Sequence, residues 1–298
     1  MANAFLKRLQ DGNVLVADGA TGTNLQKVGL IGGTPTEAWV LEQPEKILHL
    51  ESAFIAAGAD IILTCTFGGT RLRLKDSPYV KRVVEINHKA AELAHQAAQA
   101  HPKTLVAGSI GPTGLLLKPY GPWTIEEASL AYAEQAKALT EGGVDLLVIE
   151  THFALEEAKA ALEGVRKVSD LPTVVSFSFD RGLRTMMGVK PSQVVQAFQP
   201  LGVAAVGANC GTTLENMETI IKEYATLAPG LILWVKPNAG MPVVNEDGMT
   251  SYNVTPEQMG EYARRYVQIG ARVVGGCCGS TPEHIGAIAK AVKKVLSD

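Results

Sequence analysis

The chain has 298 residues, of which 46% are hydrophobic and 19% are charged, and its formal net charge is −3. These values are typical of a globular protein with a large apolar core. Lys and Arg are scattered along the sequence, which argues against a nucleic-acid-binding surface. No apolar run reaches the roughly 18 residues of a membrane span, and no signal peptide is recognisable. We therefore expect a cytoplasmic protein without nucleic-acid or membrane partners.

Short β-branched segments alternate with longer amphipathic stretches from one end of the sequence to the other. Each predicted strand precedes a plausible helix. In chain order the predicted strands are Asn13–Ala17, Asp60–Thr66, Thr104–Ser109, Asp145–Glu150, Thr173–Phe179, Ala204–Asn209, Leu231–Lys236 and Arg272–Gly276. The clearest predicted helices are Pro78–Ala100, Thr124–Glu141, Leu155–Val168, Thr212–Leu227, Thr255–Ile269 and Thr281–Leu296.

Local signals support several of these boundaries. Thr124 and Glu127 have the spacing of a capping box at a helix start. Pro256 and Pro282 each follow a threonine, at a position where a first-turn proline is tolerated. Glycines such as Gly58 precede predicted strands and indicate helix ends.

Eight successive strand–helix units predict an α/β fold, a single (β/α)8 TIM barrel that comprises residues 1–298 as one domain. The main competitor is an open, doubly wound sheet that binds a dinucleotide. The turn after the first strand, Asp18-Gly19-Ala20-Thr21-Gly22-Thr23, lacks the Gly-x-Gly-x-x-Gly spacing of such proteins. The barrel is therefore favoured, with its chemistry at the C-terminal ends of the strands.

Three of the four cysteines lie at such strand ends. Cys210 follows the sixth predicted strand, and Cys277 and Cys278 follow the eighth. Consecutive side chains of a regular strand point to opposite faces, but the glycine-flanked turn at Cys277 and Cys278 allows both sulfurs to face one ion. A four-cysteine chain of this length is not a disulfide framework, and grouped thiols indicate a metal or catalytic role.

Three thiolates suit Zn²⁺ and leave a fourth tetrahedral position open, as in a catalytic site. A free thiol is only a few per cent ionised at neutral pH, so a bound metal would supply the reactive thiolate of a thiol substrate. Cys65 is interpreted as a small buried hydrophobe rather than a fourth ligand.

Two carboxylates at strand ends complete the pattern. Asp18 and Glu150 are expected to anchor a substrate ammonium group, although turn capping and ordinary ion pairing are alternatives. Backbone N–H groups of the Gly19–Thr23 turn would hold a substrate carboxylate. His152 is expected at the rim or in solvent, and Lys236 is interpreted as structural. Together these residues predict an amino-acid pocket beside a thiol-binding metal.

These motifs resemble the homocysteine S-methyltransferase family, which includes the homocysteine domain of cobalamin-dependent methionine synthase and betaine–homocysteine methyltransferase. The likeness covers essentially the whole chain. Its most specific part is the combination of Cys210 with the later Cys277-Cys278 pair. The glycine-rich segments alone are weak evidence for the family. Cys65 is a departure, since methionine-synthase-like members commonly have Asn there. The segments that carry it are 18–23, 64–69, 111–114, 150–151, 207–211, 236–240, 275–279 and 281–284.

The resemblance implies a barrel in which Zn²⁺ is held by Cys210, Cys277 and Cys278. It also implies that Asp18 and Glu150 bind the amino group of homocysteine. Amides near Gly19, Ala20 and Thr21 would bind its carboxylate, and Asn238 would fill the fourth zinc position before substrate arrives.

The predicted reaction is methyl transfer to the homocysteine thiol, which gives methionine and a role in methionine biosynthesis. The donor is open: a methylated corrinoid protein in trans is one reading, because no folate or cobalamin domain is recognised. Small donors such as S-methylmethionine, S-adenosylmethionine or betaine are the alternative, and Phe67, Tyr120 and Trp123 could cage such a cation. Ordinary packing is the favoured reading of these aromatic residues.

Two further readings differ in class. The enzyme could methylate another thiol, such as coenzyme M or a different amino-acid thiol. Alternatively, the chain could be a structural zinc-binding barrel subunit, in which Cys65 or a histidine closes the metal site.

Overall fold

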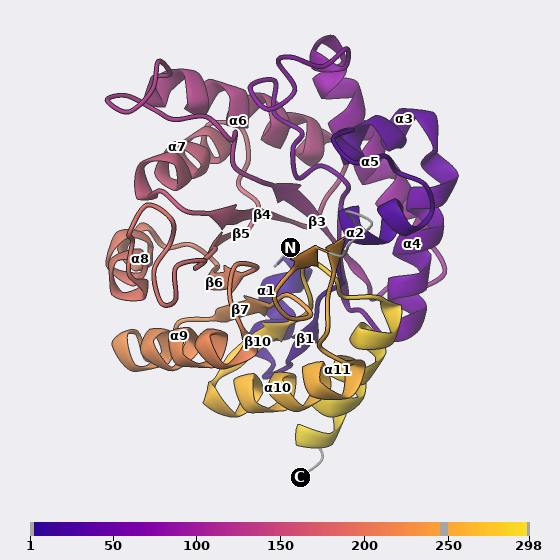
Figure 1. The fold of residues 1–298 in the computed structure, drawn as a ribbon, viewed down its shortest axis with the longest axis vertical. Coiled ribbons are helices and arrows are strands. Elements are labelled where there is room, and N and C mark those ends of the chain that lie inside the picture. Colours follow the sequence, from indigo (N-terminus) through magenta and orange to yellow (C-terminus); the bar gives the residue numbers. More distant parts are fainter. Residues whose placement is uncertain (1–2, 245–249, 297–298) are drawn as a thin grey trace.

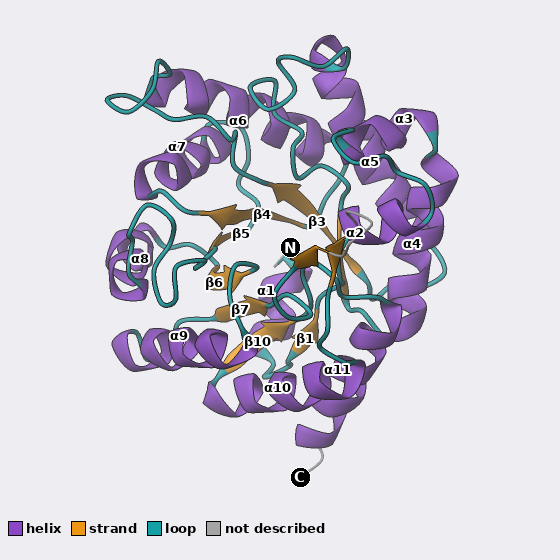
Figure 2. Cartoon of the chain, in the orientation of Figure 1, coloured by secondary structure: helices purple, strands orange, loops and turns teal. Residues whose placement is uncertain are grey.

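The computed structural model describes residues 3–244 and 250–296. Figure 1 looks down a central ring of strands surrounded by helices, and Figure 2 separates the two element types by colour. The strands of the ring are β1 (Leu15–Val16), β2 (Ile61–Leu63), β3 (Leu105–Ile110), β4 (Leu146–His152), β5 (Thr173–Phe177), β6 (Ala205–Asn209), β7 (Leu233–Lys236) and β10 (Ala271–Val274). The predicted (β/α)8 TIM barrel is confirmed.

The eight strands are hydrogen-bonded in the order β1-β10-β7-β6-β5-β4-β3-β2, and every pair is parallel. A parallel bridge between Ala17 and Ile61 joins β1 to β2 and closes the ring. The N–H of Asp18 donates to the carbonyl of Ile61 at 2.9 Å, and that of Asp60 donates to Val16 at 2.7 Å. Closure brings the ends of all eight strands around one mouth.

The short helix α2 (Gly22–Lys27) lies at the mouth of the ring, inward of the other helices in Figure 1. The outside of the ring is covered by α3 (Trp39–Glu42), α4 (Pro44–Ala57), α5 (Val83–Ala98), α6 (Ile125–Glu141), α7 (Leu155–Arg166), α8 (Pro191–Phe198), α9 (Leu214–Leu227), α10 (Pro256–Ile269) and α11 (Pro282–Val295). Thr124 and Glu127 form the predicted capping box at the start of α6. Within the described residues, every helix is too short or too polar to cross a membrane.

The predicted helix 78–100 is shorter than expected. Residues 80–82 form a 3₁₀ turn, and α5 begins at Val83. Lys81 and Arg82 are exposed, whereas Val83 is the first buried residue of the segment. The apolar face that packs a helix onto the barrel therefore starts only there.

The far end of the barrel is covered by α1 (Ala4–Gln10), which lies behind the strands in Figure 1. Phe5 and Leu9 are buried in one apolar cluster with side chains of the strands. Arg8 pairs with Asp60, and Arg272 donates to the carbonyl of Leu9. The N-terminal ends of the strands are thus sealed by apolar packing, and the C-terminal ends remain for the site.

A small two-stranded sheet of β8 (Val243–Val244) and β9 (Thr250–Ser251) belongs to the connection between β7 and α10. The two strands pair in antiparallel fashion and are mostly exposed.

Candidate active site

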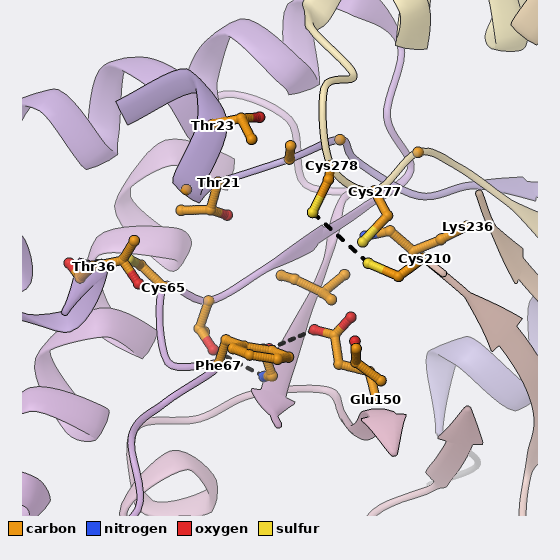
Figure 3. A pocket seen from close by; sticks show the side chains of 18 of the residues that line it. Thr21, Thr23, Thr36, Cys65, Phe67, Glu150, Cys210, Lys236, Cys277 and Cys278 are labelled. Atoms are coloured by element: carbon orange, nitrogen blue, oxygen red, sulfur yellow. Dashed lines mark hydrogen bonds between the residues drawn. The ribbon is translucent and has the colours of Figure 1, made fainter. Parts of the chain in front are cut away.

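Three sulfur atoms converge at the mouth of the barrel. The Sγ atoms of Cys210, Cys277 and Cys278 all lie within 4.8 Å of one another, and those of Cys210 and Cys278 are 3.8 Å apart. Figure 3 shows the three side chains pointing toward one another at one side of a pocket. Among the described residues, this is the one group of His, Cys, Asp or Glu side chains with such spacing.

The backbone at both strand ends is bent to bring the sulfurs together. Cys210 has φ +56° and Gly211 has φ +67°, two successive left-handed residues that end β6 sharply. A Cβ at position 211 would lie 2.4 Å from the Ser178 hydroxyl oxygen, so only glycine fits. The N–H of Cys277 donates to Pro237 at 2.7 Å, and that of Cys210 donates to Lys236 at 3.1 Å. Both cysteine loops are therefore anchored on the end of β7.

The clustered thiols differ in their tendency to ionise. Hydrogen bonds from Cys210 and Cys277 lower the pKa of Cys278 to about 3. Hydrogen bonding to its two neighbours, together with burial, raises the pKa of Cys210 well above its usual value. In the metal-free protein the cluster therefore favours a thiolate at Cys278, and a divalent cation would favour ionisation of all three.

A cavity of about 380 Å³ opens beside the sulfurs. Glu150 and Lys236 lie in its wall near the cysteines, and Thr36 and Cys65 form its opposite end (Figure 3). Backbone of the turn after β1 forms another side. The lining residues are Gly19, Ala20, Thr21, Gly22, Thr23, Gln26, Thr36, Leu63, Thr64, Cys65, Phe67, Ser109, Glu150, Thr151, Cys210, Lys236, Gly276, Cys277 and Cys278.

A buried ion pair occupies the floor of the site. Lys236 Nζ donates to Asp18 Oδ1 at 2.6 Å, and both side chains are 3% exposed. The second oxygen of Asp18 accepts the N–H of Leu63 at 2.7 Å. Burial alone would lower the pKa of Lys236, but the charges of Asp18 and Glu150 outweigh it and raise that pKa. The ammonium of Lys236 is therefore charged, and Asp18 is engaged on both oxygens.

Glu150 is the carboxyl group that faces the cavity. Ser109 donates its hydroxyl to Oε1 of Glu150 at 2.6 Å, and the residue is 7% exposed. Burial raises the pKa of Glu150 to about 7, although Lys236 opposes the shift. This carboxyl group thus changes charge near neutral pH, in contact with the cavity that holds the sulfurs.

The remaining predicted site residues fall into two groups. Gly19, Ala20 and Thr21 line the cavity as expected from the sequence, whereas Asp18 and Asn238 are outside the set of described residues that line it. A Cβ at Gly19 would meet the Phe54 ring at 2.7 Å, which explains the glycine. Asn238 is 6% exposed, and its Oδ1 has no hydrogen-bond partner among the described residues.

The expectation that His152 lies at the rim or in solvent is wrong. His152 is fully buried, and its ring packs 6.0 Å from that of Tyr132 on α6. The reason is a bulge: the register of β4 against β5 shifts between Ile149 and His152, and Thr151 has φ +61°. The extra residue turns His152 from the mouth toward the helix layer.

Two other expectations concern the cavity wall. Of the three aromatic residues considered as a cation cage, Phe67 lines the cavity, whereas Tyr120 is 75% exposed and Trp123 stacks with Lys75. Cys65 is buried at the far end of the cavity, and its thiol approaches the carbonyl of Thr36 at 3.6 Å. Among the described residues, neither these aromatic side chains nor Cys65 belongs to the three-cysteine group that could hold a metal ion.

Sequence reasoning missed the importance of Lys236 and Asn209. Lys236 follows the buried Trp234 by two positions, and Asn209 is the last residue of β6. Strand alternation places Lys236 on the same inner face as Trp234. A lysine at an inward position of a barrel strand was the available signal, because a buried ammonium needs a partner.

The donor set fits a zinc ion. Three closely spaced thiol sulfurs are the soft ligands that zinc prefers, and the unpartnered oxygen of Asn238 lies two residues beyond Lys236, on the loop to which Cys277 is bonded. The N–H of the next residue, Ala239, donates to the carbonyl of Cys278 at 2.9 Å. A buried orphan oxygen on this loop is consistent with a ligand that completes the site.

The comparisons with known proteins agree with this geometry. The sequence profile of the homocysteine S-methyltransferase family matches residues 15–292. A methionine synthase from Mycobacterium leprae is 30% identical over 297 residues, which cover 94% of this chain. The chain spans about a quarter of the length of that relative, 24%.

Solved structures extend the likeness. The metallated form of the homocysteine methyltransferase MmuM from Escherichia coli superposes with a TM-score of 0.82 and 26% identity, over 97% of this chain and 99% of that chain. A methyltransferase from Methanosarcina mazei, 12% identical with a TM-score of 0.62 over 98% and 97% of the two chains, shares the fold. With its cysteine cluster, its cavity and its matching sequence profile, the chain belongs to the homocysteine S-methyltransferase family and is a methyltransferase.

Proposed function

We propose that this protein transfers a methyl group to the thiol of homocysteine and so forms methionine. The observation that carries the proposal is that one cavity is lined by both the three-cysteine cluster and the carboxyl group of Glu150. The first suits a thiol, and the second suits the ammonium group of an amino acid. Residues 1–298 would form a single homocysteine-binding domain.

The metal of this proposal is Zn²⁺, held by Cys210, Cys277 and Cys278, with Asn238 as the resting fourth ligand. When bound, zinc supplies a Lewis acid that favours the ionised form of a thiol at neutral pH. The fit rests on the spacing of the sulfurs, the thiol chemistry of the donors and the orphan oxygen of Asn238.

Glu150 would bind the substrate ammonium, because it is the acidic side chain that lines the cavity among the described residues. Asp18 would act behind it by holding the ammonium of Lys236 in an ion pair at 2.6 Å, so that the direct partner of Lys236 is Asp18 and Glu150 faces the cavity. The amides of Gly19 and Thr21 would hold the substrate carboxylate. Ala20 contributes less, since its N–H already donates to Ser280 at 3.3 Å.

Methyl transfer to sulfur is an in-line displacement. The thiol loses its proton, a sulfur–carbon bond forms, and the bond between the methyl group and the donor breaks with its electron pair leaving on the donor. The protein's residues contribute by fixing the amino acid at Glu150, so that its sulfur lies at the cysteine end of the cavity.

The donor that we propose is a methylated corrinoid carried by a separate protein. This reading is supported by exposed apolar side chains on connections that follow the strands, where a partner would cover the mouth. They include Ile31, Phe67, Leu116, Tyr120, Met186, Met187, Met241, Val243 and Val244. Exposed apolar side chains are typical of interaction sites where they form one continuous patch, and a continuous patch over the mouth is what the corrinoid proposal requires.

The alternative donor is a small sulfonium or ammonium compound, namely S-methylmethionine, S-adenosylmethionine or betaine. Phe67 would then be the one aromatic side chain of the considered set that faces the cation.

The test is turnover of the zinc-loaded protein with homocysteine and a panel of donors: methylcobalamin, methyltetrahydrofolate, S-methylmethionine, S-adenosylmethionine and betaine. We expect methionine with methylcobalamin. Turnover only with a small donor would replace the corrinoid proposal. Methylation of coenzyme M in preference to homocysteine would overturn the choice of acceptor.

A further inference from the structure

The side chain of Asn209 makes four hydrogen bonds at the mouth of the barrel. It is fully buried at the end of β6, directly before Cys210. Its Oδ1 accepts the Ser176 hydroxyl at 2.6 Å and the N–H of Thr151 at 3.0 Å. Its Nδ2 donates to Thr151 Oγ1 at 2.6 Å and to Cys277 Sγ at 3.9 Å. One amide group therefore contacts β4, β5 and the loop after β10.

Thr151 needs this support. It is a β-branched residue with φ +61°, a conformation that such residues rarely adopt. It is also the bulge residue of β4 and directly follows Glu150. Two bonds from the same amide, one to the backbone N–H and one to the hydroxyl, hold Thr151 in place. Strained residues persist only where the surroundings over-determine them.

We infer that Asn209 is a positioning residue that ties the amino-acid end of the site to the sulfur end. Through Thr151 it fixes the direction of the Glu150 carboxyl group, and through its N–H it orients the sulfur of Cys277. Its backbone also leads directly into Cys210. The functional meaning of this link rests on the proposed function, but the link itself consists of hydrogen bonds within the protein.

The amide form is essential to this role. Thr151 and Cys277 each receive one N–H from Nδ2, and Oδ1 accepts two donors, so all four hydrogen-bonding positions are used. An aspartate would retain the acceptor side, lose both N–H donors and place a negative charge beside the sulfur. An alanine would remove all four contacts.

The test uses cobalt(II) as the metal probe, because its absorption reports sulfur coordination directly. The variants are Asn209→Ala and Asn209→Asp, with Ser176→Ala as the matched control that removes one contact to the same oxygen. We expect Co²⁺ to bind Asn209→Ala about 10-fold more weakly, with a shifted sulfur-to-cobalt absorption band. Ser176→Ala should leave the band in place. An unchanged band and affinity in Asn209→Ala would overturn the inference.

A second arm separates the two ends of the link. Glycine adopts φ +61° without support, so Thr151→Gly introduced into Asn209→Ala should restore the backbone at Glu150 but not the Co²⁺ affinity. Crystal structures of the single and double variants would show this. We expect KM for homocysteine to rise about 10-fold or more in Asn209→Ala and to recover in the double variant. If the backbone of Thr151 kept its native conformation in Asn209→Ala, Asn209 would not be what holds it, and the inference would fail.

These outcomes are separable from the proposed function. The Co²⁺ affinity, the absorption band and the position of residue 151 are measured without homocysteine. If the wild-type protein fails to methylate homocysteine yet these readouts respond as described, the proposed function fails and the role of Asn209 stands. If the wild type turns over and the readouts are unchanged, the reverse holds.

Discussion

The interior of the barrel has two layers with opposite chemistry, although both come from the same strands. The lower layer, toward the N-terminal ends of the strands, is an apolar cluster of alternate strand residues that is covered by Phe5 and Leu9. Ala107, Val148 and Trp234 belong to this cluster. Two residues further along the same strands, the inward positions become Ser109, Glu150 and Lys236, all of which line the cavity. The change from apolar to polar side chains thus occurs over two residues of each strand, a distance of about 7 Å.

The lower layer stabilises the fold, and the upper layer forms the site. Residues of the lower layer contribute burial of apolar surface, which stabilises the fold without facing the cavity. Residues of the upper layer bring charged and polar groups out of water, which costs stability unless they are paired. Substitutions in the lower layer should therefore change the free energy of unfolding, whereas substitutions in the upper layer should change metal and substrate binding.

We expect the largest effect on binding and activity, with little effect on stability, at Cys210. Cys210→Ser removes one of three sulfur ligands, so we expect zinc binding and methyl transfer to fall by more than about 100-fold. The midpoint of urea unfolding of the metal-free protein should change little, because the residue lies above the apolar layer. Zinc content by mass spectrometry and turnover give the first result. Retention of zinc with full turnover would contradict it.

Lys236 is an exception among the residues of the upper layer, because we expect it to affect the stability of the fold. Lys236→Met leaves the buried carboxyl group of Asp18, whose pKa burial already raises, without its charged partner, so we expect a loss of about 3–5 kcal/mol in the free energy of unfolding. Adding Asp18→Asn removes that carboxyl group and should restore most of the loss. Urea unfolding of the single and double variants measures this. A double variant as unstable as Lys236→Met would mean that the pair is not the cause.

Leu146 represents the lower layer. It is fully buried within the apolar cluster, so Leu146→Ala should cost about 2–5 kcal/mol of unfolding free energy through lost burial and a residual cavity. Zinc content and KM, expressed per folded molecule, should remain within about two-fold of the wild type. A large rise in KM without loss of stability would show that the layers are not independent.

Glu150 gives the pH signature of the upper layer. Its pKa is raised to about 7, so the carboxylate that binds an ammonium group forms as pH rises through that value. We expect kcat/KM for homocysteine to fall about 10-fold per pH unit below it. Glu150→Gln should remove this component and lower kcat/KM at pH 8 by about 10–100-fold, the loss of one charge-assisted hydrogen bond. An identical pH profile in both proteins would remove Glu150 from substrate binding.

The sequence predicted the barrel and its cysteine cluster because both depend on simple periodicities. Eight strand–helix alternations define the closed fold, and parallel strands end at one face, so Cys210 and Cys277 had to lie near each other. Strand bounds were less accurate: β2 covers Ile61–Leu63 rather than Asp60–Thr66. The N–H of Thr64 still donates to Ala107 of β3 at 2.9 Å, but that of Thr66 turns back to the carbonyl of Thr64 at 2.8 Å, so the chain leaves the ladder there.

The details of the site depended on contacts that no local pattern encodes. The bulge at Thr151 reversed the expected orientation of His152, and its stability comes from Asn209, 58 residues away. The pairing of Asp18 with Lys236 spans 218 residues. The sequence thus identified the side chains at the mouth. It could not show that Asp18 pairs with Lys236, whereas Glu150 faces the cavity.

We propose that the sulfurs of Cys210, Cys277 and Cys278 hold a zinc ion to which the substrate thiol is added. X-ray absorption at the zinc edge counts the sulfur atoms around the metal. We predict three sulfurs and one lighter ligand in the zinc-loaded protein, and four sulfurs after homocysteine is added. Four sulfurs before addition, or three that persist with saturating homocysteine, would contradict the account.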